Sequence, residues 1–106
     1  MFLFGTALAE IAKGDPASLK QAVDYLELLV QKEPNNGMAW RQLGIAYGRL
    51  DQLGASYTAL AEQSRVMGDI KQAKDYLSLA KPHLNTGSKE WLRAEDLRRV
   101  LEMAED

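Results

Sequence analysis

Apolar residues recur along this chain at intervals of three and four positions, and no stretch alternates apolar and polar residues as a strand would. That spacing places the apolar side chains of each segment on one face of a helix. The sequence therefore predicts an all-α fold. We expect about six helices joined by connections of about two to six residues, which favours antiparallel hairpins.

Residues that start or stop helices divide the chain into these segments. The first helix is expected at 2–13, ahead of Gly14-Asp15-Pro16. The boundaries expected further along are a capping box of Ser18 and Gln21, a stop at Pro34, a cap at Asn35 or Asn36, a turn at 51–54, a stop at Gly68, a cap at Asp69, a stop at Lys81-Pro82 and a start at Ser88. The longest irregular connection is expected at 83–87, before the last helix.

The third expected helix carries Trp40, Leu43, Gly44 and Tyr47, a spacing typical of helical repeats. The glycine lets a partner helix approach closely, and the three larger side chains fill the groove around that contact. This half of the pattern resembles the first helix of a tetratricopeptide repeat. The half that belongs to the second helix fits a set upstream, which consists of Ala22, Leu26, Leu29 and Pro34.

A second hairpin in the following segment also fits the repeat pattern. Its set begins at Tyr57, seventeen positions after Trp40, which is half the usual period of about 34 residues, so the register of the repeats stays open. We expect one domain over 1–106, built of about three helix pairs stacked as a short right-handed solenoid. The residues expected to pack the repeats together are Trp40, Leu43, Gly44, Tyr47, Tyr57, Leu60, Ala61, Gly68, Ala73, Leu77, Ala80 and Trp91.

Outward positions on the first helix of each pair line the concave side of such arrays. On the third expected helix these are Arg41, Ile45 and Arg49, which share a face. Glu62 and Arg65 join them if the fourth helix also faces the groove. We expect this candidate groove to bind a protein or peptide segment, because the planar fork of arginine suits carboxylates; ordinary solvated arginines are the alternative. The lysine and asparagine residues of a carboxylate clamp are absent from the corresponding places, which disfavours an adaptor for chaperone tails.

Composition narrows the chemistry expected of the chain. Its 106 residues include no Cys and one His, His83, which excludes thiol chemistry and any His–His metal motif. The glycines are dispersed and form no phosphate-binding loop, so we expect no catalytic group, no cofactor and no metal. The formal charge is −2, and basic and acidic residues interleave over 70–106, which disfavours nucleic acid as a partner.

The amino-terminal run from Met1 to Ala9 is apolar but lacks the basic region of a signal peptide, and Glu10 follows at once. It is also shorter than the roughly 20 apolar residues that span a bilayer. We expect this segment to be a helix that packs on the domain. No membrane span and no targeting signal is expected.

Three stretches of the sequence carry a more specific resemblance. They are 39–50, then 59–62 with Gly68-Asp69, and finally 87–97, which reads Gly-Ser-Lys-Glu-Trp-Leu-Arg-Ala-Glu-Asp-Leu. Over about residues 19–101 the chain resembles the carboxy-terminal tetratricopeptide domain of bacterial periplasmic zinc metallopeptidases, the BepA-like group of HExxH proteases. The ending at 87–94 is the most specific part, because generic tetratricopeptide arrays lack it.

This resemblance implies a non-catalytic module in the periplasm that presents a groove to a protein partner. The partner would be a substrate, an outer-membrane assembly protein or the protease domain of the same polypeptide. The chain contains no His-Glu-x-x-His, so neither the zinc ligands nor the general base of the family transfers to it.

Three alternatives stand beside this interpretation. Residues 14–40 also resemble the tetratricopeptide parts of cytochrome c maturation factors, which bind apocytochrome tails, although the ending at 87–94 argues against that host. A helical scaffold that associates with itself through an exposed end helix is the second alternative. The third, an enzyme in its own right, lacks a candidate catalytic group.

Overall fold

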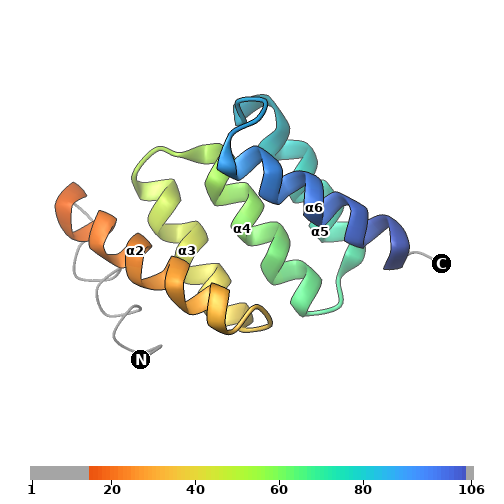
Figure 1. Cartoon of the computed structure of the whole chain (residues 1–106), viewed down its shortest axis with the longest axis horizontal. Helices are drawn as coiled ribbons and strands as arrows, with labels where there is room; N and C mark the ends of the chain where they lie inside the picture. Colours follow the sequence, from red (N-terminus) through yellow and green to blue (C-terminus); the bar gives the residue numbers. More distant parts are fainter. Residues whose placement is uncertain (1–14, 105–106) are drawn as a thin grey trace.

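The computed structural model describes residues 15–104, which form five α-helices and one turn of 3-10 helix (Figure 1). In chain order they are α2 (Pro16–Lys32), α3 (Gly37–Arg49), α4 (Leu53–Val66), α5 (Ile70–Ala80), the 3-10 turn η1 (Lys81–His83) and α6 (Lys89–Ala104). The predicted all-α class is confirmed. The helix expected at 2–13 lies outside the described residues.

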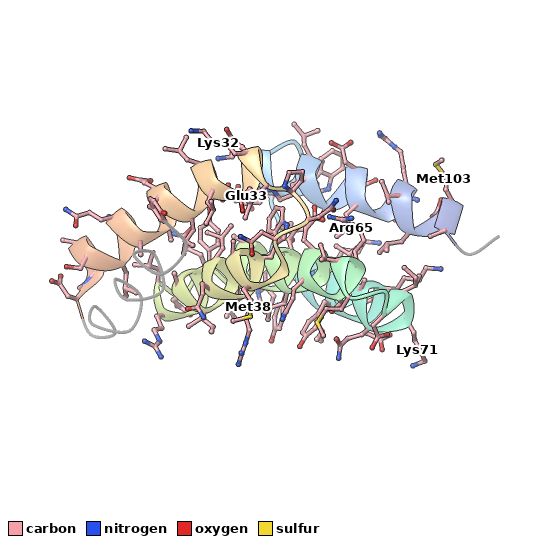
Figure 2. The ribbon with its side chains drawn as sticks, turned by 90° about the horizontal axis from the view of Figure 1, so that it is seen from below. Lys32, Glu33, Met38, Arg65, Lys71 and Met103 are labelled. Carbon is pink, nitrogen blue, oxygen red and sulfur yellow. The ribbon has the colours of Figure 1, made fainter. Side chains whose placement is uncertain are left out.

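The five helices lie in two layers. Helices α3, α4 and α5 lie side by side in one layer, and α2 and α6 lie on the same face of it (Figure 2). Helix α2 packs against α3, whereas α6 packs against both α4 and α5. The stacking of these hairpins into a right-handed solenoid stays a prediction.

Short-range side-chain chemistry starts most of these helices where the sequence predicted. Asn36 accepts a hydrogen bond from the Ala39 amide at 3.0 Å, and Asp69 accepts one from the Gln72 amide at 3.0 Å. Ser88 does the same for the Trp91 amide at 3.1 Å. Each side-chain oxygen satisfies an amide that the first turn of a helix leaves without a partner.

Three predicted boundaries are wrong. Helix α2 begins at Pro16 with Asp15 as its N-cap, so Ser18 lies inside the first turn, where its hydroxyl donates to Asp15 at 2.9 Å. Proline fits the first helical position because that amide has no partner there, so the helix starts earlier than a serine cap implies. Gly54, expected in a turn, lies in the first turn of α4, and His83, expected in the irregular connection, belongs to η1.

The core consists of two clusters of buried side chains. The larger one joins α2, α3 and the start of α4, and includes Leu26, Trp40 and Leu43. The smaller one joins α4, α5 and α6 around Ala61, Ala73, Leu97 and Leu101. Small alanines at the α4–α5 contact let these two helices lie close together.

Candidate functional site

A buried charged cluster joins helices from both layers. Arg93 of α6 donates two hydrogen bonds to the carboxylate of Glu27 on α2, one to Oε2 at 3.0 Å and one to Oε1 at 2.7 Å. The hydroxyl of Tyr47 on α3 donates to the same carboxylate. The Arg93 guanidinium also lies over the ring of Trp40, with Cζ 5.2 Å from the ring centroid, within the range of a cation–π interaction. We call Glu27, Trp40, Tyr47 and Arg93 the Glu27–Arg93 cluster.

The proton affinities in this cluster follow from its burial and its hydrogen bonds. Burial opposes ionisation of Glu27, but the hydrogen bonds from Arg93 and Tyr47 outweigh it and hold the pKa of the carboxyl below its usual value of 4.5. Burial and the bond to Glu27 together raise the pKa of Tyr47 well above that of a free tyrosine. Burial alone would lower the pKa of Arg93, but the hydrogen bonds to Glu27 raise it. The cluster is therefore a stable ion pair at neutral pH with no group near its titration point.

Two predicted groove residues, Glu62 and Arg65, lie near this cluster, and Arg65 holds the α2–α3 turn. Arg65 forms an ion pair with Glu62 at 2.9 Å and donates to the carbonyl of Pro34 at 3.1 Å (Figure 2). The indole of Trp40 donates to the same carbonyl at 2.8 Å. A carbonyl oxygen has two lone pairs, so both donors are accommodated. Arg65 and Glu62 therefore serve the fold.

The other three predicted groove residues lie on the opposite side of the layer. Arg41 and Arg49 are exposed and Ile45 is half-buried, at the same helical register as Met38. Met38 points away from α2 and α6, whereas Arg65 reaches toward the turn that follows α2 (Figure 2). The structure does not bring the five predicted residues into one groove, because α4 turns Glu62 and Arg65 toward the second layer.

The residues predicted to pack the repeats occupy three kinds of position. The buried ones are Trp40, Leu43, Gly44, Tyr47, Ala61, Ala73 and Ala80. The half-buried ones are Tyr57, Leu60, Leu77 and Trp91. Gly68 is exposed and follows α4 with φ at 84°, a left-handed conformation that glycine adopts without strain. At Gly44 an added Cβ would lie 2.9 Å from Leu60 Cδ2, so this glycine lies at a close helix–helix contact.

A groove of about 370 Å³ runs between α5 and α6. Its apolar lining comes from both helices and from the connection between them, and consists of Leu77, Leu84, Trp91, Ala94 and Leu101. Lys74 and Lys81 line it from the α5 side, and Arg98 lines it between Glu95 and Glu102 on α6. We call this the α5–α6 groove. Leu77, Leu84 and Trp91 are only half-buried, so the groove presents apolar surface to solvent.

Sequence reasoning missed the Glu27–Arg93 cluster and the α5–α6 groove. Glu27 follows Val23 by four positions on the buried face of α2, and a carboxylate at such a position indicates a buried partner. Arg93 likewise precedes the buried Leu97 by four positions. The α5–α6 groove could be predicted only in part from the sequence, because the packing of α6 decides which sides of α5 and α6 face each other.

The chain matches no model of a known protein family and no curated protein. Within 15–104 no helix has the length and apolar character needed to cross a membrane. The same residues contain no group of three or more His, Cys, Asp or Glu side chains arranged to hold a metal ion.

Proposed function

We propose that this chain is a protein-binding module and the non-catalytic part of a periplasmic zinc-dependent metallopeptidase. The observation that carries the binding role is the α5–α6 groove, where half-buried apolar side chains lie between two charged walls. Binding sites for protein segments combine an apolar centre with a polar rim in this way. The metallopeptidase host rests on the resemblance of residues 87–94 to the ending of that family's tetratricopeptide domain.

The binding role is tested by site-specific photo-crosslinking in the cells that produce the protein. A photoreactive residue at Ser78, which is exposed and lines the α5–α6 groove, is compared with one at Arg41 on the outer face of α3. Asp24, exposed on α2, serves as the control position. We expect a discrete cross-linked protein from Ser78 that is absent from Asp24.

The outcomes separate the two candidate surfaces. Cross-links from Arg41 alone would keep the binding role but move it to the face of α3 that the sequence predicted. Equal yields from all three positions would contradict a specific binding module. Adducts between two copies of the chain, together with a mass by light scattering that rises with concentration, would favour a self-associating scaffold instead.

The host is tested independently of the binding surface by sequencing the gene around this coding segment. An HExxH domain encoded upstream would support the metallopeptidase. A membrane-anchored helical region would favour a cytochrome c maturation factor, whose partner is an apocytochrome tail.

A further inference from the structure

Helix α6 is held by few buried side chains. It buries three residues, Ala94, Leu97 and Leu101, whereas α2, α3 and α4 each bury seven. Helix α5 buries only Ala73 and Ala80, but it packs closely along α4. An element with little buried apolar surface opens at a lower free-energy cost than the whole fold. We therefore expect α6 to be the described helix that separates most easily from the rest.

The contacts of α6 fall into two groups. Leu97 and Leu101 belong to the smaller core cluster, which joins α6 to α4 and α5. Arg93, one turn earlier, bonds to Glu27 of α2 through two hydrogen bonds and lies over the ring of Trp40 on α3. The pair of Arg93 and Glu27 thus ties α6 to the α2–α3 hairpin. Because both side chains are largely buried, breaking this pair leaves an uncompensated charge, so the contact contributes strongly to holding α6 in place.

The connection before α6 has the properties of a hinge. Asn85, Thr86 and Gly87 are all exposed. Gly87 has φ at 87°, which glycine adopts without strain, and a Cβ there would meet no non-neighbouring atom within 4 Å in the described part of the chain. Hinges consist of a few loop residues that absorb backbone rotation at the end of an element. Rotation about 85–87 would move α6 as a unit and leave α5 and η1 in place.

The position of α6 decides whether the α5–α6 groove exists. Trp91, Ala94 and Leu101 line this groove from α6, and Leu77 lines it from α5. Arg93 is not among the lining residues that the structure describes, because its side chain extends toward α2 instead. A contact outside the groove therefore controls whether the groove forms.

We propose that α6 opens as a unit about residues 85–87, and that the pair of Arg93 and Glu27 holds α6 in the closed position that forms the α5–α6 groove. Opening separates Leu97 and Leu101 from α4 and α5 and removes one wall of the groove. Arg93 and Glu27 are positioning residues, because they act on the groove through the placement of α6. The consequence for partner binding rests on the proposed function, whereas the opening of α6 does not.

Amide hydrogen exchange of the intact chain, followed by NMR at increasing low concentrations of urea, measures the opening. The amides of Leu97 and Leu101 in α6 should exchange faster than those of Leu43 and Ala46 in α3. Their exchange should also depend less on urea, because opening of α6 exposes less surface than unfolding of the whole chain. Identical rates and urea dependences in the two helices would overturn a separate opening of α6.

Three variants distinguish opening of α6 from unfolding of the whole chain. Arg93→Ala should accelerate exchange in α6 by about 30-fold or more, because it leaves Glu27 unpaired. Arg99→Ala is the matched control on the same helix: Arg99 is exposed and pairs with Asp96 of α6 itself at 3.2 Å, so its loss should change exchange in α6 by less than about threefold. Leu19→Ala leaves a cavity in the larger core cluster and should accelerate exchange in α3 but not in α6, because the opened state retains that cluster. Equal acceleration of both helices in Leu19→Ala, or unchanged exchange of α6 in Arg93→Ala, would overturn the proposal.

Cross-linking from Ser78 separates the opening of α6 from the proposed function. Arg93→Ala should lower the yield of the Ser78 cross-link. The double variant Glu27→Leu with Arg93→Leu leaves no unpaired charge and should restore both slow exchange in α6 and the cross-link. A cross-link that stays lost in the double variant while α6 exchanges slowly would show that the pair contacts the partner directly, which would overturn the positioning role. Separate opening of α6 without any Ser78 cross-link from the original chain would support the opening and contradict the proposed function.

Discussion

Arg93 and Glu27 form a two-point ion pair between residues 66 positions apart in the sequence. Their side chains are only 18% and 10% exposed, and they join α6 to α2 on the one face of the α3, α4 and α5 layer where both helices lie. Tyr47 and Trp40 of α3 complete the contact from below. The first and last described helices are therefore held on one face of the molecule by a polar contact.

Removing one partner of this pair should destabilise the fold strongly. Either Glu27→Ala or Arg93→Ala leaves the opposite charge in a largely buried site, at a cost of about 2–4 kcal/mol, slightly below the range for fully buried pairs. Unfolding in urea, followed by circular dichroism, measures this loss. A change below about 0.5 kcal/mol would show that water replaces the missing partner.

Replacing both partners with apolar residues should cost less than either single change. The double variant Glu27→Leu with Arg93→Leu leaves no unpaired charge, so its free energy of unfolding should lie closer to that of the original chain. Additive losses in the double variant would mean that Glu27 and Arg93 act independently.

The low pKa of Glu27 predicts a loss of stability in acid. Because the native pKa lies below the usual 4.5, the unfolded chain binds more protons than the native state when the pH lies between the two values. The contribution of Glu27 is thus fully present above pH 4.5 and is lost as the pH falls through its native pKa. Urea unfolding of the original chain and of Glu27→Gln, from about pH 7 to about pH 3, should show a shallower pH dependence in the variant. Parallel curves would contradict the shift.

The sequence predicted those parts of this fold that depend on neighbouring residues. Asn36, Asp69 and Ser88 cap helices because each side-chain oxygen reaches the amide three residues on, a relation that holds wherever the helix lies. The class of fold followed from apolar periodicity for the same reason. Ser18 was assigned wrongly because Asp15 satisfies the same chemistry three residues earlier.

Long-range relations could not be predicted in the same way. The pairing of Arg93 with Glu27 depends on α6 lying on the same face as α2, and nothing in the local spacing of either helix specifies that face. The five residues predicted to line one groove lie on two different sides of the layer for the same reason. The sequence places Arg65 beside Arg41 only if α4 faces the groove, and the packing of α4 instead turns Arg65 toward Pro34.

Gly54, which the sequence predicted in a turn, lies in the first turn of α4 and in close contact with the backbone of η1. A Cβ at this position would lie 2.7 Å from the carbonyl oxygen of His83, a backbone atom that moves only with η1. Gly54→Ala should therefore lower the free energy of unfolding by about 2–3 kcal/mol, the upper part of the range for overpacking. Gly37→Ala is the matched control, since its Cβ would meet Val66 at an ordinary 3.5 Å. Equal stability of the two variants would show that η1 shifts freely.

The last prediction compares Arg65 with Arg41. The sequence predicts both in one binding groove, but in the structure Arg65 bonds to the α2–α3 turn and Arg41 is exposed on the outer face of α3. Arg65 donates to Pro34 at 3.1 Å and pairs with Glu62, so Arg65→Ala removes charge-assisted bonds to the α2–α3 turn and should cost about 1–2 kcal/mol. Arg41 is exposed on the outer face of α3, so Arg41→Ala should change stability by less than about 0.5 kcal/mol. Urea unfolding of both variants decides the matter. If Arg65→Ala is as stable as Arg41→Ala, the contact with the turn contributes nothing to folding, and Arg65 becomes available again as a binding residue.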